Sequence, residues 1–393
     1  MKAVTVVGAS LAGLQAARSL RSQGFDGRLV IVGNEQHRPY DRPPLSKEFL
    51  AGKVEADSLR LEDDDDEALD AEWLLGTPAS SLDTVSREVV LADGSRIRSD
   101  GVVIATGARA RTLAGAGAHA GVHMLRTLDN AVKLRDELVP GSRLVVVGAG
   151  FIGGEVASTA HALGCQVTVV EAMPTPLAGP LGIEMGAIVS GLHEQQGVRL
   201  ICGVGVSRLV SRERVEAVEL TDGTSLPADV VVVGVGAVPN VEWLAGSGVT
   251  LGNGVACDHE GRTSVPGVVA VGDCAAWRDV RLGRPHRVEH WTGALERPLT
   301  AVTSLLSGSV FDNTVSKPTN IPYFWSDQYD VRIQFVGHAA DADSVTVEEG
   351  AVEGCNVLAV YRRGEELVAV LGMNQARLFG RWRRQLNAAT VAA

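Results

Sequence analysis

The stretch SRLVVVGAGFIGGEVASTAHALGCQVTVVEA, residues 142–172, passes from an apolar run through a glycine-rich turn into an amphipathic run. It then enters a second apolar run that ends in Glu171. That order predicts a strand, a glycine turn, a helix and a second strand. The chain opens on the same order in KAVTVVGASLAGLQAARSLRSQGFDGRLVIVGNE, residues 2–35, which ends in Glu35. Repeated motifs of this kind, with all-apolar strands, predict an α/β fold whose parallel sheets are covered on both faces.

Each of the two glycine turns has the spacing that brings a backbone close to a dinucleotide. The spacing is G-x-S-x-x-G at Gly8, Ser10 and Gly13, and G-x-G-x-x-G at Gly148, Gly150 and Gly153. Glycine lets the backbone approach a pyrophosphate, the anion lies at the helix N-terminus, and the acidic residue after the second strand binds ribose hydroxyls. A single match also occurs in the ordinary turns of α/β proteins. Two matches, each with its acidic residue, predict two dinucleotide sites.

Two further apolar runs end in motifs that belong with the first nucleotide. RIRSDGVVIATGAR, residues 96–109, contains Ala105-Thr106-Gly107, and GVVAVGDCAA, residues 267–276, contains Gly272-Asp273. Because both lie outside the second motif, they predict that the first domain is split into residues 1–111 and 241–318. The second nucleotide domain, residues 112–240, is then an insertion. Residues 319–393 alternate apolar and polar side chains, which predicts antiparallel strands and a separate α+β domain that ends in a basic helix.

The composition excludes several classes of protein. The chain has 393 residues, is 45% hydrophobic and carries a net charge of −11 without a Lys/Arg-rich block, which argues against nucleic-acid binding. No apolar run approaches the roughly 18 residues of a membrane span. Five scattered cysteines indicate reduced thiols and a cytoplasmic protein, and no metal site is predicted. The acidic run EDDDDEALDAEWLLGT, residues 62–77, predicts a solvated helix start.

Two dinucleotides held by one chain suggest a relay in which a nicotinamide gives hydride to a flavin. With these motifs, the sequence closely resembles the FAD-dependent NADH:ferredoxin reductases of bacterial oxygenase and cytochrome P450 systems. These are reductases of the putidaredoxin, rhodocoxin and biphenyl dioxygenase type. The resemblance covers nearly the whole chain. Its most specific pieces are PYDRPPLSK, GAGFIGGEVA, GVGAVPN, AVGDCAA and FWSDQYD, which occur in the order and spacing of that family.

The resemblance implies two Rossmann-like domains in a glutathione-reductase-like arrangement, together with the residues that line each cofactor. The FAD residues that it adds to the first fingerprint and to Ala105, Thr106 and Gly107 are Ala12, Glu35, Arg42, Lys47, Ala79, Arg126, Asp273 and Trp291. The NADH residues that it implies are Gly148, Gly150, Ile152, Gly153, Glu155, Glu171 and Gly236. It also implies that Trp325 lies near the flavin, toward the acceptor.

The segment RPYDRPPLSKEFLAG, residues 38–52, distinguishes this chain from relatives that reduce disulfides. Those relatives carry a cysteine pair in the helix beside the flavin, whereas this segment has no cysteine and has Lys47 instead. A cation there stabilises an anionic reduced flavin, the Pro43-Pro44 pair orients the following helix that carries Lys47, and Arg42 is positioned to meet a pyrophosphate. The resemblance implies that Glu155 pairs with Lys47. From the residues alone, Lys47 could equally be a solvated lysine, and Glu155 could merely complement a helix dipole.

The predicted function is transfer of electrons from NADH through FAD to a [2Fe–2S] ferredoxin that serves an oxygenase or cytochrome P450. Two alternatives remain open, an NADH oxidase or peroxidase of the same superfamily and a flavin-binding interaction protein like apoptosis-inducing factor. The ferredoxin is expected to dock on a local basic patch. The candidate arginines for this patch are Arg281, Arg284, Arg287, Arg381, Arg383 and Arg384.

Overall fold

The computed structural model describes residues 1–113, 119–279, 283–308, 311 and 321–392, and the chain forms two compact units. Unit 1 comprises Met1–Asp41, Arg60–Arg109 and Val238–Pro322. Unit 2 comprises Arg42–Leu59, Ala110–Ala237 and Tyr323–Ala393. The predicted three-domain boundaries stay a prediction, and the boundary at residues 318/319 lies outside the described residues. Arg281, a predicted docking residue, also lies outside them.

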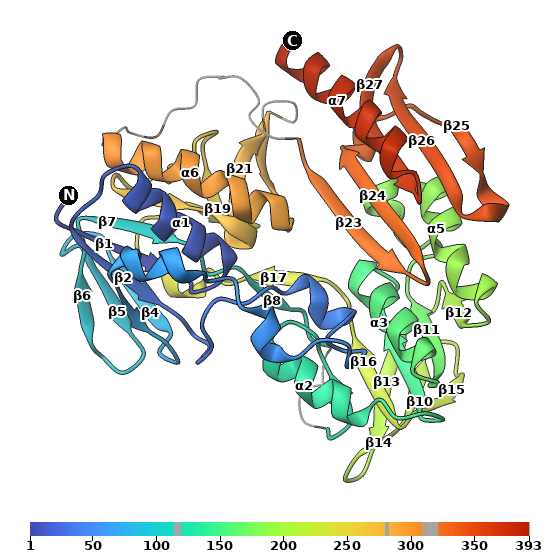
Figure 1. Ribbon diagram of the computed structural model, residues 1–393. Helices are drawn as coiled ribbons and strands as arrows, with labels where there is room; N and C mark the ends of the chain where they lie inside the picture. Colours follow the sequence, from blue (N-terminus) through green and yellow to red (C-terminus); the bar gives the residue numbers. More distant parts are fainter. Residues whose placement is uncertain (114–118, 280–282, 309–310, 312–320, 393) are drawn as a thin grey trace. The chain divides into compact units, whose positions relative to one another are not determined.

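Unit 1 is built on a parallel sheet in the order β20-β7-β1-β2-β3. Its strands are β1 (Ala3–Val7), β2 (Arg28–Val32), β3 (Ala71–Leu74), β7 (Gly101–Ile104) and β20 (Val268–Ala270). Helices α1 (Leu11–Ser22) and α6 (Trp291–Ser307) lie side by side (Figure 1). The central strands are apolar at almost every position because both of their faces are covered. Residues 268–270 thus pair with β7 in the sheet of the first βαβ motif, although they are distant from it in the sequence.

Two smaller sheets complete unit 1. The first is antiparallel, with strands β4 (Ala79–Asp83), β5 (Glu88–Leu91) and β6 (Arg96–Arg98). The second has strands β18 (Leu251–Gly252), β19 (Gly254–Cys257), β21 (Ala275–Asp279) and β22 (Arg284–Arg287).

The acidic run differs from its prediction of a solvated helix start. It forms only a short 3₁₀ helix, η3 (Asp64–Leu69), which follows the N-cap Asp63 and leads into strand β3. Within this helix Asp66 is buried, because its carboxylate accepts hydrogen bonds from Arg18 on α1, at 2.6 Å from Nη2. The run is therefore solvated only in part.

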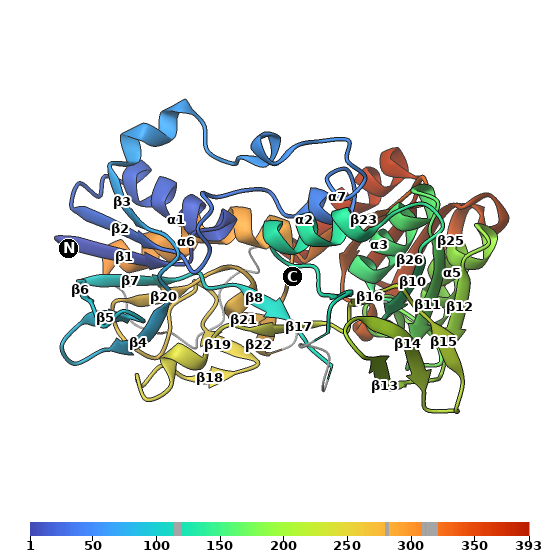
Figure 2. The same ribbon diagram turned by 90° about the horizontal axis from the view of Figure 1, so that it is seen from below.

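Unit 2 contains a second parallel sheet, in the order β12-β11-β10-β16-β9. Its strands are β9 (Val122–His123), β10 (Arg143–Val147), β11 (Gln166–Glu171), β12 (Arg199–Cys202) and β16 (Val230–Val233). Helices α2 (Leu128–Glu137) and α3 (Phe151–Ala162) cover one face and β13 (Val206–Ser211), β14 (Val215–Leu220) and β15 (Ser225–Pro227) the other (Figure 2). Alternate valines divide between the two faces, since Val146 packs under the helices and Val145 under the small sheet.

The C-terminal part of unit 2 is a five-stranded antiparallel sheet followed by a helix, as predicted. The strands are β23 (Tyr323–Gln328), β24 (Val331–Gly337), β25 (Ser344–Ala351), β26 (Asn356–Arg363) and β27 (Glu366–Met373). Helix α7 (Ala376–Ala392) packs against β27, and helices α4 (Ala178–Leu181) and α5 (Ile183–Gln195) share the core of this sheet. The α/β fold class with two Rossmann-like motifs is thus confirmed. No helix among the described residues is both long and apolar enough to cross a membrane.

Candidate functional site

The two glycine turns have nearly the same backbone geometry. A Cβ at Gly8 would lie 2.0 Å from the Ala105 carbonyl oxygen, and one at Gly13 would lie 1.8 Å from the Gly8 oxygen. In the second turn, a Cβ at Gly148 would lie 2.4 Å from the Gly234 oxygen, and one at Gly153 would lie 2.1 Å from the Gly148 oxygen. Each turn therefore needs glycine at its first and last fingerprint positions, because the next strand end and the helix start pass too close for a side chain.

Both turns lead into a helix whose N-terminus can receive an anion. The N-cap residue is Ser10 for α1 and Gly150 for α3, and neither helix has a side-chain cap hydrogen bond or an acidic residue in its first turn. A Cβ at Gly150 would meet no atom of the chain within 4 Å. Amides at a helix start attract phosphate, so this geometry fits the pyrophosphate of a dinucleotide at each helix.

The structure brings several predicted FAD residues together in unit 1. Gly272, with φ +71°, lies so near the first helix that its Cβ would be 2.9 Å from the Ala12 Cβ, which places the adjacent Asp273 beside the first fingerprint. The Ala105-Thr106-Gly107 motif follows β7 and is tied to Asn240, because the Thr106 hydroxyl donates to the Asn240 oxygen at 2.6 Å. The two motifs outside the first βαβ motif thus meet its glycine turn.

Other predicted FAD residues are held by contacts of their own. Glu35 accepts a hydrogen bond from the Tyr40 hydroxyl at 2.5 Å. Trp291 begins α6, and its indole donates to Asp41 at 2.9 Å. Ala79 begins β4.

Arg42 and Arg126, like Lys47, are predicted FAD residues that belong to unit 2. The Arg42 guanidinium donates to the Arg126 carbonyl oxygen at 2.7 Å. The structure therefore brings these two residues together with each other, in a different unit from the first fingerprint.

The predicted NADH residues cluster at the carboxyl end of the second parallel sheet, where open α/β sheets bind their ligands. Glu171 ends β11, and its carboxylate accepts from the amides of Ala149 and Met173, both at 2.9 Å. Ile152 lies on α3, is exposed, and is next to the anion-receiving helix start. Gly236 follows β16 and accepts a backbone hydrogen bond from Arg111 at 2.9 Å.

Lys47 and Glu155 form an ion pair within unit 2, at 3.2 Å between Nζ and Oε1. Only 12% of the lysine side chain and 4% of the glutamate side chain are exposed. The pair thus meets, although the two residues lie far apart in the sequence. The prediction that Lys47 lies on a helix is wrong, because the prolines start a single 3₁₀ turn, η1 (Pro43–Ser46), and Lys47 is its C-cap.

Sequence reasoning missed the hydroxyls that surround this pair. Ser46 and Ser326 both donate to the Glu155 carboxylate, at 2.5 and 2.8 Å. The serine in LSKEF and the one in FWSDQ carry no chemical motif of their own. The sequence signal that points to Ser326 is the resemblance of the FWSDQYD segment to the family.

The buried thiols of unit 1 are protected from solvent. Cys274, next to Asp273, and Cys257 are 0% and 1% exposed, and burial raises the pKa of both thiols. Both therefore favour the protonated form, which is a poor nucleophile.

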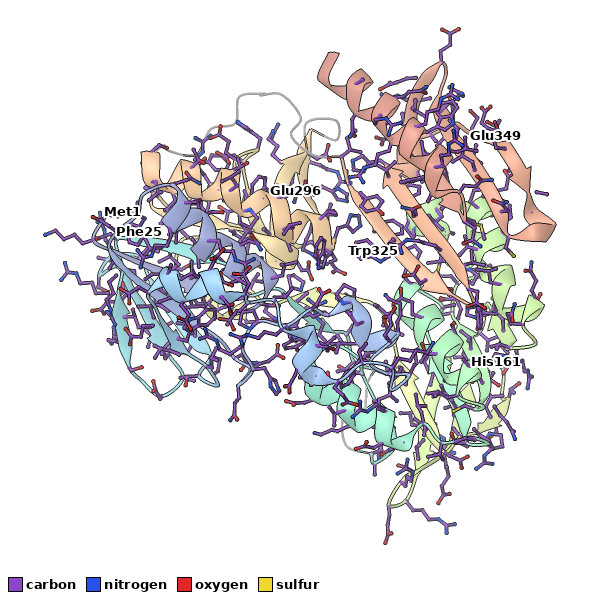
Figure 3. All side chains as sticks on the ribbon, in the orientation of Figure 1. Met1, Phe25, His161, Glu296, Trp325 and Glu349 are labelled. Atoms are coloured by element: carbon purple, nitrogen blue, oxygen red, sulfur yellow. The ribbon has the colours of Figure 1, made fainter. Side chains whose placement is uncertain are left out.

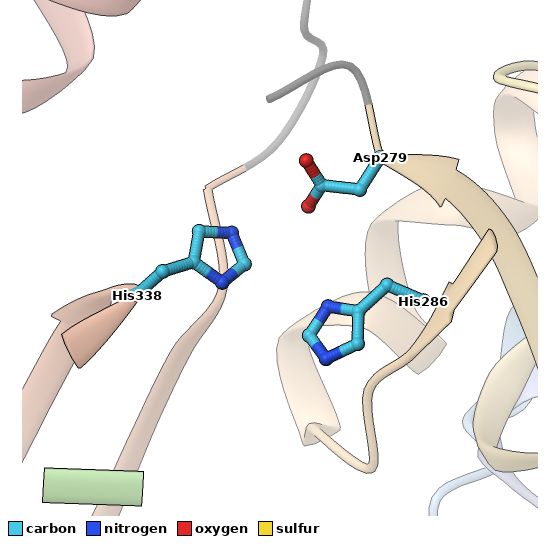
Figure 4. Close-up of side chains that lie close together, drawn as sticks. All are labelled: Asp279, His286 and His338. Atoms are coloured by element: carbon cyan, nitrogen blue, oxygen red, sulfur yellow. The ribbon is translucent and has the colours of Figure 1, made fainter. Parts of the chain in front are cut away.

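Figure 4 draws Asp279 and His286, which come from the paired strands β21 and β22, together with His338, which follows β24. The first two side chains belong to unit 1 and the third belongs to unit 2. We therefore do not treat the three as one metal site.

Comparison with known proteins gives matches over the whole chain. The pattern of the pyridine nucleotide-disulphide oxidoreductases matches residues 2–297, and that of the reductase C-terminal region matches residues 323–393. The chain is 39% identical over 335 residues to the benzene 1,2-dioxygenase system ferredoxin–NAD(+) reductase subunit of Pseudomonas putida, covering 85% of this chain and 80% of that one.

Two further comparisons concern putidaredoxin reductase. The chain is 35% identical over 382 residues to the putidaredoxin reductase of Pseudomonas putida, covering 95% of this chain and 88% of that one. Its fold matches the reductase in the crystal structure of a covalent putidaredoxin reductase–putidaredoxin complex, with a TM-score of 0.91, 34% identity and coverage of 98% of this chain and 92% of that one.

Proposed function

The chain belongs to the pyridine nucleotide-disulphide oxidoreductase family, and from that premise we propose that it passes electrons from NADH through FAD to a [2Fe–2S] ferredoxin, which serves an oxygenase or cytochrome P450. The observation that carries this proposal is the pair of dinucleotide turns in one chain, together with a buried Lys47–Glu155 ion pair in a segment without cysteine. The relatives named above, which are ferredoxin reductases of oxygenase and P450 systems, support it.

Each cofactor has its own set of residues in this proposal. The FAD residues of unit 1 are Gly8, Ser10, Ala12, Gly13, Glu35, Ala79, Ala105, Thr106, Gly107, Asp273 and Trp291, and those of unit 2 are Arg42, Lys47 and Arg126. The NADH residues are Gly148, Gly150, Ile152, Gly153, Glu171 and Gly236. When bound, FAD accepts a hydride from NADH and releases its two electrons singly. The chain supplies helix N-termini for the pyrophosphates and carboxylates for the riboses.

Lys47 and Glu155 act at the hydride-transfer step. Lys47 presents a cation that stabilises negative charge developing on the reduced cofactor. Glu155 holds the ammonium group in place through their ion pair at 3.2 Å. A peroxidase-type alternative needs a redox cysteine beside the cofactor, and residues 38–52 contain none.

For the acceptor, helix α7 offers a basic exposed face. Arg377, Arg381 and Arg384 lie at helical spacing i, i+4 and i+7, all are exposed, and α7 has no acidic residue. The opposite face packs on the sheet through Phe379 and Leu386. An acidic ferredoxin would dock on this arginine face, which we call the α7 basic face.

Two of the predicted docking arginines, Arg287 and Arg383, make other contacts. Arg287 pairs with Glu289 and donates to the Asp273 carbonyl oxygen. Arg383 lies over the Tyr323 ring, 4.2 Å from its centroid, and Tyr323 in turn stacks on Trp325 of β23, which is labelled in Figure 3. Arg284 is exposed on β22 and remains a candidate.

The α7 basic face is tested by charge reversal. Arg381→Glu with Arg384→Glu should raise the KM for ferredoxin and weaken its dependence on salt, because exposed charges are screened over about 10 Å at 0.1 M. Arg199→Glu on β12 is the matched control, since Arg199 is also exposed. Ferricyanide needs no docking face, so its reduction should not change. Equal losses with both acceptors, or a ferredoxin KM that ignores salt in the parent protein, would remove α7 from the docking surface.

We further propose that the protein works in the cytoplasm, a reducing compartment. All five cysteines are free in the structure, including the partly exposed Cys202 and Cys355. Mass spectrometry of the protein isolated under alkylating conditions should find all five as thiols.

The experiment that tests the first half of the function is anaerobic mixing of the FAD-loaded protein with NADH. The visible flavin absorbance should bleach at one equivalent of NADH. A flavin that stays oxidised in excess NADH would contradict the proposal.

A further inference from the structure

We propose that the β23–β24 hairpin positions the Glu155 carboxylate, with Ser326 and Ser46 as its positioning residues. The C-terminal region then serves the NADH half-reaction as well as the acceptor side. This inference rests on the proposed role of the Lys47–Glu155 pair in hydride transfer.

The Glu155 carboxylate receives four donors from two segments of the chain. Its Oε2 accepts from the Ser46 hydroxyl at 2.5 Å. Its Oε1 accepts from the Ser326 hydroxyl at 2.8 Å, from the Asp327 amide at 3.3 Å and from the Lys47 ammonium at 3.2 Å. Since the side chain is 4% exposed, water cannot replace a missing donor freely, and each hydroxyl fixes one oxygen.

The hairpin is held against α3 by contacts of the residues that follow Ser326. The Gln328 amide donates to the Ser326 hydroxyl at 3.1 Å, which leaves that hydroxyl's single proton for Glu155. Gln328 lies so close to α3 that a Cβ at Gly154 would be 2.5 Å from its Oε1. At the turn, the Tyr329 amide donates to the Ser158 hydroxyl at 2.8 Å.

The tip of the hairpin is anchored further into unit 2. The Tyr329 hydroxyl is 2.7 Å from Nδ1 of His193 on α5, and Tyr329 and Asp330 form a two-residue turn with φ of 49° and 63°. Primed turns of this kind match the twist of a hairpin. The hairpin is therefore a rigid support that reaches the α3 helix from the C-terminal sheet.

The segment Ser46–Lys47 also holds the Glu155 carboxylate. Ser46 immediately precedes Lys47, and its carbonyl oxygen accepts from the Thr159 hydroxyl of α3 at 2.8 Å. The ammonium group and the Ser46 hydroxyl thus reach the carboxylate from consecutive residues. Loss of either serine leaves a buried carboxylate oxygen short of a donor, so the carboxylate turns and no longer holds Lys47 at one position.

The test compares serine variants of the FAD-loaded protein by stopped-flow reduction with NADH. Ser326→Ala should slow flavin reduction about tenfold, the factor carried by one buried hydrogen bond to a charged group, with an unchanged Kd for NAD⁺. In a Glu155→Gln background the same change should have little further effect, because Ser326 acts through Glu155. Ser190→Ala is the matched control, since Ser190 is also buried in unit 2 and its hydroxyl donates to the Ala187 oxygen within α5 at 3.1 Å.

A second readout does not depend on turnover. Lys47 should react faster with an amine-acetylating reagent in Ser326→Ala than in the parent protein, relative to the exposed Lys53 in the same sample. Ser46→Ala should give the same two effects and replaces Ser326→Ala if that variant does not fold. The inference is overturned if the slowing is as large in the Glu155→Gln background, or if both the rate and the Lys47 labelling match those of Ser190→Ala. Failure of NADH to reduce the parent flavin would instead contradict the proposed function itself.

Discussion

Gly150→Ala separates the requirements of the fold from those of the nucleotide. A Cβ at Gly150 meets no atom of the chain within 4 Å, and the residue has an ordinary φ of −76°. The free energy of unfolding should therefore fall by about 1 kcal/mol or less, which is the cost of replacing a glycine N-cap by alanine. The added methyl occupies the approach to the pyrophosphate. NADH binding should weaken by at least about tenfold, or about 1.4 kcal/mol.

Gly153→Ala should behave in the opposite way. Its Cβ would lie 2.1 Å from the Gly148 carbonyl oxygen, so the turn or the helix must shift. Such overpacking costs about 1–3 kcal/mol and lowers the melting temperature. Gly191→Ala on α5 is the control, because a Cβ there meets nothing within 4 Å and the residue is away from the turn.

The assay pairs thermal unfolding with the KM for NADH in ferricyanide reduction. Gly150→Ala should raise the KM and leave the melting temperature almost unchanged, and Gly153→Ala should lower the melting temperature. An unchanged KM in Gly150→Ala would refute the assignment of this helix N-terminus to NADH.

Three other predictions concern residues of unit 2, namely Lys47, Glu171 and His193. Lys47→Ala should slow flavin reduction by NADH about tenfold to a thousandfold with FAD still bound, and an unchanged stopped-flow rate would return Lys47 to a structural role. NADH should be preferred over NADPH by at least about tenfold in kcat/KM because Glu171 repels a 2′-phosphate; equal values would contradict this. Burial lowers the pKa of His193 from 6.5 to about 4. As the pH falls, His193 therefore takes up its proton first in the unfolded chain. The free energy of unfolding should fall by up to about 3 kcal/mol between about pH 6.5 and about pH 4. Urea unfolding at pH 7 and pH 4.5 should show that His193→Gln removes this part of the loss; the same loss in both proteins would speak against it.

The α/β fold was predictable because it depends on local patterns. Apolar strands, a glycine turn and an acidic residue near the second strand end occur within each βαβ motif, and the structure has Glu35 after β2 and Glu171 as the last residue of β11. The sequence also assigns residues 267–276 to the first nucleotide motif, and residues 268–270 pair with 102–104 in one parallel sheet. The domain bounds stay a prediction.

The surroundings of the Lys47–Glu155 pair were not predictable from local patterns. Ser46 and Ser326 look like ordinary serines, and only the docking of the β23–β24 hairpin on α3 brings both to one carboxylate. The proline pair likewise suggested a helix for Lys47, whereas a single 3₁₀ turn presents it. Such details depend on tertiary contacts between segments far apart in the sequence.

The basic C-terminal helix illustrates a third case. The sequence predicts this helix, and its predicted docking arginines are the neighbouring residues Arg381, Arg383 and Arg384 of GRWRRQ. Helical spacing turns Arg383 toward Tyr323 and instead aligns Arg377 with Arg381 and Arg384 on the exposed face. A helix pattern read at 3.6 residues per turn would have found this face.

The central claim is most directly tested by NADH-driven reduction of cytochrome c with and without a [2Fe–2S] ferredoxin. The FAD-loaded protein should reduce cytochrome c rapidly only when the ferredoxin is present, at a rate that saturates with ferredoxin concentration. A flavin that NADH bleaches but that transfers no electrons to any [2Fe–2S] ferredoxin, or cytochrome c reduction at the same rate without one, would contradict it.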